Sequence, residues 1–246
     1  KQFFAFVRHQ RKAQSPHVVN NNGIVEHKPD VISELFVNYF SSVFNEQTVI
    51  PDDPPPCNLH IPKFDSIDLT EQAIKEKIQS LQNDKSPGLD GITPRLLKLC
   101  EDNISPVLLK MFQISYSNGK FPCAWKLANI TPIHKGGDTT KLSNYRPIAL
   151  TSVVCKIFES MIACSVKSHV DNHCLLLPQQ HGFVTGRSCV TQLMNVFYTW
   201  LNILDKPHPP MIDTVILDFA KAFDVMPHNV LLHKLSSQYN ISGNVW

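Results

Sequence analysis

The stretch from Thr214 to Asp224, TVILDFAKAFD, constrains the fold of this chain more than any other feature. Val215–Leu217 form a continuous apolar run, and the loop Pro207–Pro210 bounds this run upstream. Such a run predicts a strand that is buried on both faces. Asp218 follows the run directly, and an acid at the end of a buried strand is costly unless it has a partner.

The carboxylate of Asp218 has two interpretations. Mg²⁺ binds one or two carboxylates and completes its shell with substrate phosphates, so Asp218 is a candidate for half of a metal clamp in phosphoryl transfer. The other interpretation is that Asp218 caps the turn or helix predicted at Ala220–Asp224. This segment alone does not decide between them.

Several blocks of the chain resemble, in their order, the reverse transcriptases of non-LTR (LINE-type, jockey/CR1-like) retrotransposons. They resemble the extra amino-terminal block of that group, the fingers hairpin, the block between fingers and palm, and the first palm motif with its following helix. The blocks are DKSPGLDGI at Asp84–Ile92, the segment Trp125–Ser152 with NYRPIAL, QQHGFVTGRS at Gln179–Ser188, and LDFAKAFD with its continuation at Leu217–Leu235. Phe6–Gln14 and Leu35–Phe44 resemble the connector between an endonuclease and the polymerase.

The resemblance implies an α/β (α+β) fold, a right-hand polymerase fragment with helix-rich fingers and the start of an antiparallel palm sheet. We expect a connector helix and Pro-rich linker at 1–69, the fingers region at 70–205 and a truncated start of the palm at 206–246. The implied parent is an RNA-directed DNA polymerase that transfers dNTP to a primer 3′-hydroxyl on an RNA template. It would carry an endonuclease domain upstream and act in the nucleus and cytoplasm within a retrotransposon ribonucleoprotein.

The fingers block carries two candidate nucleotide ligands. Ile130, Ile133 and Asn144–Leu150 predict two strands joined by a glycine-containing loop. By resemblance, Lys135 and Arg146 bind the triphosphate of the incoming nucleotide. A guanidinium offers phosphate a planar fork and a lysine offers it a mobile point charge. The alternative for Arg146 is an ion pair with a neighbouring acid such as Asp138.

Two aromatic residues of the palm motif receive roles from the resemblance. Phe223, five residues after Asp218, would lie beneath the sugar and exclude a 2′-hydroxyl. Phe219 would offer its backbone carbonyl to the metal ion. The alternative for Phe223 is a core aromatic under the palm sheet.

The two remaining blocks are predicted to be loops because of their glycine and proline content. By resemblance, they lie near the template or the nucleotide, and glycines there permit close backbone approach. Turn formation alone also explains the glycines and prolines. The candidate template-binding residues are Lys85, Gly88, Gln180, Gly182, Phe183 and Arg187.

One part of the family pattern is missing from this sequence. The paired aspartates of the (Tyr/Phe)-Ala-Asp-Asp type have no counterpart, because Asp52-Asp53 lies in a Pro-rich segment. Mg²⁺, or Mn²⁺, would bind at Asp218 only together with that pair. We therefore expect a fragment that is inactive alone. The alternatives are a non-catalytic nucleic-acid-binding remnant or host-recruited domain, and a structural helical adaptor that binds neither RNA nor dNTP.

Composition narrows the class of protein. The net charge is only +2, but Lys and Arg outnumber Asp and Glu between Lys85 and Lys156, which offers contacts to phosphate. No run of eighteen apolar residues and no signal-peptide core is present, so we expect neither membrane insertion nor secretion. The seven cysteines form no CxxC pair, and HVDNHC at His169–Cys174 is predicted to be a polar loop rather than a zinc site.

Capping residues and apolar periodicity predict several helices. One is expected at Val31–Phe44, one after Thr70 and one opened by Ser105 with Pro106 at its first position. Two more are expected at Ser152–Ala163 and Ser188–Leu204.

Overall fold

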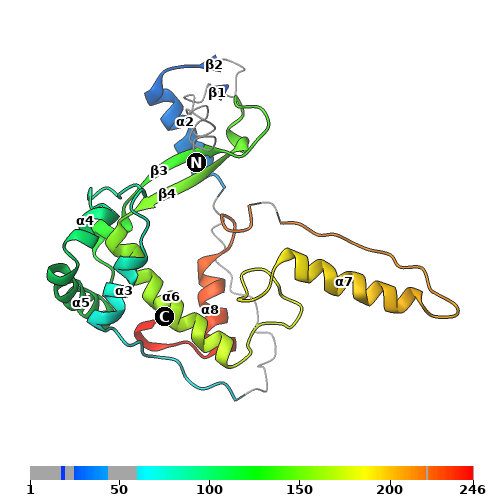
Figure 1. Ribbon diagram of the computed structural model, residues 1–246. Coiled ribbons are helices and arrows are strands. Elements are labelled where there is room, and N and C mark those ends of the chain that lie inside the picture. Colours follow the sequence, from blue (N-terminus) through cyan, green and yellow to red (C-terminus); the bar gives the residue numbers. More distant parts are fainter. Residues whose placement is uncertain (1–17, 20–24, 44–59, 220, 246) are drawn as a thin grey trace, which may run out of the picture. The chain divides into compact units, whose positions relative to one another are not determined.

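The computed structural model describes residues 18–19, 25–43, 60–219 and 221–245. Helices dominate this part of the chain, and its strands form antiparallel pairs (Figure 1), which confirms the predicted α/β class. The predicted connector residues 6–14 and linker residues 45–59 lie outside the described residues. The division of the chain into connector, fingers and palm stays a prediction.

The chain divides into two compact units, and one of the boundaries between them falls inside helix α6. The first unit comprises residues 1–49, 68–161 and 224–227, and the second comprises 50–67, 162–223 and 228–246. The elements are β1 Val18–Val19, β2 Val25–Glu26, α2 Pro29–Ser41, α3 Glu71–Ser80, α4 Pro94–Leu99, α5 Glu101–Ser117, η1 Cys123–Lys126, β3 Ala128–His134, η2 Leu142–Asn144, β4 Tyr145–Thr151, α6 Val153–Asn172, α7 Cys189–Leu204, α8 His228–Tyr239 and η3 Gly243–Val245.

Side-chain caps fix the starts of three helices, and two of these caps, Thr70 and Ser188, lie where the sequence predicts a helix to start. The hydroxyl of Thr70 accepts from Ala73 N at 3.2 Å and opens α3. Thr93 caps α4 in the same way, with Pro94 at its first position. Ser188 forms a capping box with Thr191 at the start of α7.

Helix α5 begins at Glu101, five residues before the predicted first position Pro106, so the prediction that Ser105 caps it was wrong. Ser105 lies inside the helix, is buried, and donates its hydroxyl to Glu101 O at 2.7 Å. Two acids, Glu101 and Asp102, occupy the first turn, where the helix dipole favours negative charge. Asp102 also pairs with Lys75 of α3 at 3.0 Å. The stabilisation that these contacts give to α5 exceeds the destabilising effect of Pro106, which lies in the second turn of the helix.

Aromatic rings from three elements form a core of the first unit. Phe112 of α5 stacks on Phe158 of α6 with ring centroids 4.7 Å apart, and both side chains are fully buried. Trp125 of η1 packs edge-on against Phe112 at 5.8 Å. The β3–β4 hairpin lies between η1 and α6 in the sequence, so the packing of these two elements fixes the two ends of the hairpin.

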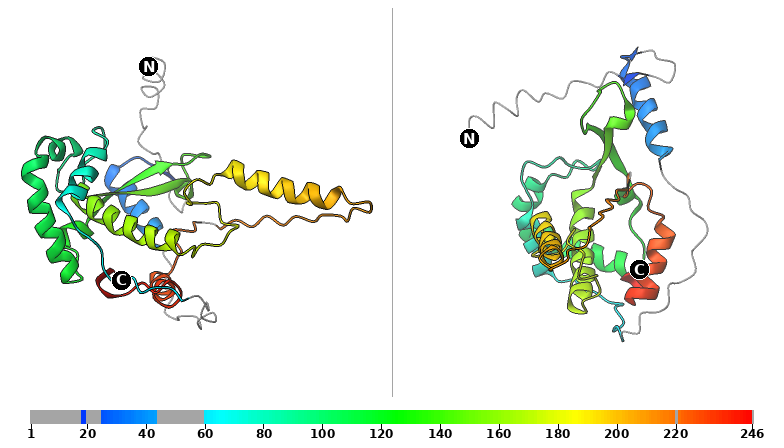
Figure 2. Two further views of the ribbon diagram at one scale, coloured as in Figure 1. Left: turned by 60° about the horizontal axis from the view of Figure 1, so that its bottom comes forward. Right: turned by 90° about the vertical axis from the view of Figure 1, so that its right-hand side faces the viewer.

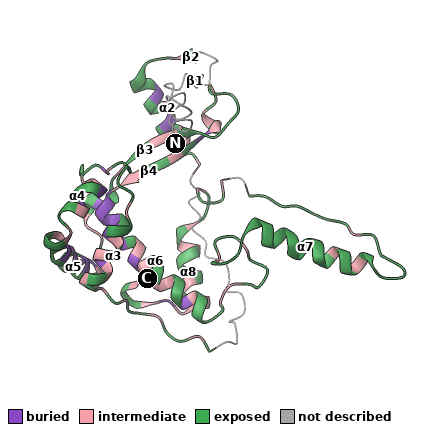
Figure 3. Ribbon diagram, viewed as in Figure 1, coloured by how far each residue is buried: buried purple, intermediate pink, exposed green. Residues whose placement is uncertain are grey.

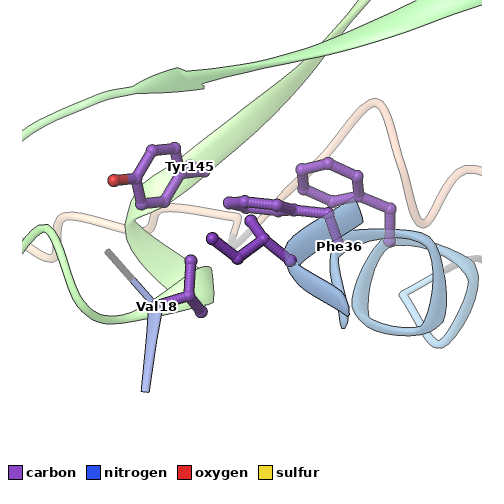
Figure 4. Packing of buried hydrophobic residues seen from close by; sticks show 5 residues of the cluster. Val18, Phe36 and Tyr145 are labelled. Carbon is purple, nitrogen blue, oxygen red and sulfur yellow. The ribbon is translucent and has the colours of Figure 1, made fainter. Parts of the chain in front are cut away.

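A second hydrophobic cluster joins α2 to the hairpin (Figure 4). Val18, Ile32, Phe36, Phe40 and Tyr145 are all buried in it. The ring of Phe36 meets Tyr145 edge-on at 5.0 Å, and α2 lies along the hairpin in both views of Figure 2.

In the second unit, the prediction of a polar loop at His169–Cys174 was wrong for 169–172, which belong to α6. His169 lies in the last turn of α6 and is buried. Its ring stacks on Phe64 at 4.9 Å, and its Nε2 lies 3.0 Å from Tyr239 O. The helix continues beyond Ala163, its predicted end, and this packing holds the added turns in place.

The strand predicted at Val215–Leu217 is not formed. Residues 211–219 have no regular secondary structure, and the three apolar side chains are 81–89% exposed. A strand needs a neighbour for its backbone hydrogen bonds, and no strand of the described part of the chain pairs with this segment. Helix α7 is similarly uncovered, because none of its residues is buried (Figure 3).

Within the described ranges, no helix combines the length and the apolar character that a membrane crossing requires.

Candidate functional site

The β3–β4 hairpin brings Lys135 and Arg146 onto one face. The register pairs Ile133 with Arg146, and the backbone N–H of Lys135 donates to Asn144 O at 2.8 Å, which extends the ladder by one step. Side chains two residues apart in a strand point to the same face. Lys135 and Arg146 are therefore diagonal neighbours, and both are exposed.

Tyr145 determines which face of the hairpin carries these cations. Its ring is buried against Phe36 of α2, and its hydroxyl donates to Thr139 O at 2.8 Å. Desolvation, with a smaller effect of the Asp138 charge, raises the pKa of Tyr145 above its ordinary value. Because neighbouring residues of a strand point to opposite faces, burial of Tyr145 directs Arg146 to solvent.

The hairpin loop is ordered by its own hydrogen bonds. Gly136 and Gly137 have φ angles of 126° and 83°, which an L side chain rarely adopts. Asp138 accepts from Thr140 N at 2.9 Å and from Thr140 Oγ1 at 2.7 Å, and these bonds lower the pKa of Asp138. The Asn144 side chain donates to Asp138 O at 2.9 Å. The glycine-containing loop that the sequence predicts is present, and these hydrogen bonds tie its two sides together.

The proposed pairing of Arg146 with Asp138 does not occur in the structure. The carboxylate of Asp138 accepts from Thr140 instead. Within the described ranges, ion pairs join Lys63 to Asp65 and Lys75 to both Glu71 and Asp102, and neither Lys135 nor Arg146 takes part in one. Two neighbouring cations without a protein anion offer a site for a phosphate-bearing ligand.

The predicted loop at Asp84–Ile92 is confirmed, but its buried glycine has a structural explanation. A Cβ added to Gly88 would lie 2.6 Å from Ser152 N and 2.7 Å from Thr151 C. Gly88 thus permits close approach to the junction of β4 and α6, and its role in template contact stays a prediction. Lys85 of the same loop is exposed.

Arg187 holds the loop at Gln179–Ser188 together. Its guanidinium donates to Pro178 O and, at 2.7 Å, to Gln180 O. Gln180 in turn donates its amide to Gly182 O at 3.3 Å. Phe183 follows, 88% exposed and at a φ of 62°.

Asp218, Phe219 and Phe223 lie exposed on the chain that leads to α8. Phe219 and Phe223 are each 82% exposed, so the interpretation of Phe223 as a core aromatic was wrong. In the described part of the chain, the sheet expected above Phe223 is not formed, so no palm sheet covers the ring. The ring of Phe183 approaches that of Phe223 edge-on, with centroids 6.1 Å apart and an interplanar angle of 86°.

The residues around Asp218 do not make up a metal site by themselves. The carboxylate of Asp218 and the carbonyl of Phe219 are suitable oxygen donors for Mg²⁺. However, no group of three or more His, Cys, Asp or Glu residues in the described part of the chain lies close enough to hold an ion.

The structure therefore assembles the predicted site residues in separate groups. Lys135 and Arg146 meet in the first unit, and Phe183 and Phe223 meet in the second. Sequence reasoning missed Tyr145 as the residue that orients Arg146. The alternation of an aromatic and a cation in NYRPIAL was the available signal. No sequence signal indicated the contact of Phe183 with Phe223.

Comparison with known proteins identifies the family. Residues 133–240 match the family described as reverse transcriptase (RNA-dependent DNA polymerase). The chain is 30% identical over 169 residues to the probable RNA-directed DNA polymerase from transposon BS of Drosophila melanogaster, which covers 68% of this chain and 18% of that protein. It is 31% identical over 167 residues to the RNA-directed DNA polymerase from mobile element jockey of Drosophila melanogaster, covering 68% and 18%.

A longer match involves the putative 115 kDa protein in type-1 retrotransposable element R1DM of Drosophila melanogaster. Identity is 26% over 240 residues, which cover 95% of this chain and 21% of that protein. The chain thus spans about a fifth of the length of these relatives. The hairpin, the Asp218 motif and these matches agree, and the chain belongs to the reverse transcriptase family, among the RNA-directed DNA polymerases of non-LTR retrotransposons.

Proposed function

We propose that this chain supplies the nucleotide-binding part of an RNA-directed DNA polymerase that extends a DNA primer on an RNA template. The observation that carries the proposal is the pair Lys135 and Arg146, two exposed cations on one face of the hairpin with no ion pair to a described acid. A dNTP presents a triphosphate that such a pair binds with charge-assisted hydrogen bonds.

Each residue has a separate part in this proposal. Arg146 and Lys135 bind and orient the triphosphate, which brings the nucleotide into position and contributes by proximity. Asp218 and the carbonyl of Phe219 provide oxygen donors toward a divalent metal ion, which supplies charge stabilisation in phosphoryl transfer when further carboxylates complete its site. Phe223 lies against the sugar and disfavours a 2′-hydroxyl.

The proposal extends to the parent protein. An RNA template, a DNA primer and dNTP are its substrates, an endonuclease domain is encoded with it, and it acts in the nucleus and cytoplasm within a ribonucleoprotein. Lys85, Gln180 and Gly182 remain candidates for template contact, because all three are exposed. Gly88 and Arg187 are weaker candidates, because packing and loop hydrogen bonds occupy them.

Equilibrium binding of dNTP to the 246-residue chain tests the hairpin directly. Arg146→Ala should weaken binding by about 1.5–3 kcal/mol, the value of a charge-assisted hydrogen bond. Arg95→Ala is the matched control, because Arg95 is an exposed arginine of α4 in the same unit. Lys110→Ala controls in the same way for Lys135→Ala. Equal losses in the site and control variants would refute the triphosphate site and favour a general nucleic-acid-binding surface.

Primer extension tests the catalytic part. The 246-residue chain should give background signal on poly(A) with oligo(dT), dTTP and Mg²⁺, because its sequence lacks the aspartate pair. Extension should appear in a longer chain that carries the pair, and Asp218→Ala should abolish it. Asp213→Ala is the matched control, since Asp213 is exposed in the same irregular segment. Extension by the short chain, or by the Asp218 variant, would contradict the proposal.

A further inference from the structure

We propose that Phe183 is a positioning residue that holds the ring of Phe223 in place and thereby sets discrimination between deoxyribose and ribose. This inference rests on the proposed role of Phe223 at the sugar. The two rings meet edge-to-face, with centroids 6.1 Å apart and an interplanar angle of 86°. This is a favoured geometry for an aromatic pair.

Phe223 needs such a partner because solvent surrounds most of its ring. Its side chain is 82% exposed, so core packing does not restrict its rotamer. A group that excludes a hydroxyl by its position must be held rigidly, since a ring that swings away leaves room for that hydroxyl. In the described part of the chain, the aromatic ring in contact with Phe223 is that of Phe183.

The backbone at Phe183 supports a positioning role. Its φ of 62° lies in the left-handed region, which a bulky residue rarely adopts. The surrounding loop maintains this conformation: Arg187 donates to Pro178 O and Gln180 O, and Gln180 donates to Gly182 O. Strain held by the surroundings points to a functional role. Phe183 is itself 88% exposed, so burial of its ring does not explain the conformation.

The test measures kcat/KM for dNTP and for the matching rNTP in the full-length parent polymerase. Phe183→Leu, which keeps apolar bulk but loses the ring, should lower the dNTP/rNTP ratio by about 2- to 12-fold, the equivalent of one aromatic pair. Phe183→Tyr keeps the ring edge and should retain the ratio. Phe183→Gly removes the ring and relieves the left-handed strain, so it should lower the ratio without lowering the melting temperature.

A double-mutant cycle separates the possible outcomes. Phe223→Val should lower the ratio, and Phe183→Leu should then have no further effect, because it acts through the missing ring. If Phe223→Val leaves the ratio unchanged, the sugar role of Phe223 fails, and the inference fails with it. If Phe223→Val lowers the ratio but Phe183→Leu and Phe183→Gly do not, only the positioning role is overturned. Equal loss of kcat/KM for both nucleotides on changing Phe183 overturns it as well, and indicates a template contact.

Discussion

Substitution of Gly88 by alanine separates packing from ligand binding in the loop Asp84–Ile92. The added Cβ would lie 2.6 Å from Ser152 N, 2.7 Å from Thr151 C and 2.8 Å from Ser152 Cα. All three atoms belong to the backbone, so no flexible side chain can move aside. Either the loop or the junction of β4 and α6 must shift.

The expected cost follows from this overpacking. Extra methyl groups in a close-packed site typically destabilise a protein by about 1–3 kcal/mol. For a chain of this length, that corresponds to a fall of about 2–12 °C in Tm. Thermal unfolding followed by circular dichroism measures this fall.

Gly182→Ala provides the matched control. Gly182 was also predicted to bind template, but a Cβ there meets no atom within 4 Å, so its Tm should change by no more than a typical surface substitution does. RNA binding is measured on the same two proteins. An unchanged Tm for Gly88→Ala, together with weakened RNA binding, would refute the packing argument and return Gly88 to the template site.

Three further predictions concern individual groups. Burial, and to a smaller extent the charge of Glu159, raises the pKa of Cys155 to about 12, so iodoacetamide at pH 8 should modify exposed Cys100 while leaving Cys155 intact by mass spectrometry; native labelling of Cys155 would contradict this. The amides of Val215–Leu217 should exchange hydrogen without protection, and strong protection in a monomer would show that a strand forms there after all. Tyr145→Phe should cost about 0.5–1.5 kcal/mol in urea unfolding at pH 8. Because the pKa of Tyr145 is raised, its neutral form stabilises the fold below the ordinary tyrosine pKa and this contribution is lost as pH rises through the folded value, so the difference between parent and variant should shrink at high pH.

Capping patterns in the sequence predicted the start of a helix well where the side chain of the capping residue makes the first hydrogen bond. Thr70 and Ser188 cap α3 and α7 at the expected positions because the capping hydrogen bond lies within one turn. Ser105 looked equally suitable, yet α5 starts earlier, where Asp102 reaches Lys75 of another helix. A contact between residues far apart in the sequence decided that start, and capping patterns carry no information about such contacts.

The distinction between local patterns and contacts with distant elements also explains which parts of the candidate site could be predicted from the sequence. Lys135 and Arg146 could be predicted together because the family resemblance indicates both, and alternation along two paired strands brings them to one face. Strand formation in an apolar run cannot be predicted from the run alone. Val215–Leu217 have strand-forming side chains, but a strand also needs neighbouring strands, and the sequence pattern of the run does not supply these. The side chains of Val215–Leu217 are 81–89% exposed, as expected for a strand-forming sequence that has no sheet to join. The chemistry at Asp218 therefore depends on elements that pair with this segment, whereas the hairpin already holds its two cations in a defined geometry. Nucleotide binding at the hairpin should accordingly be measurable in this chain before any catalytic step is.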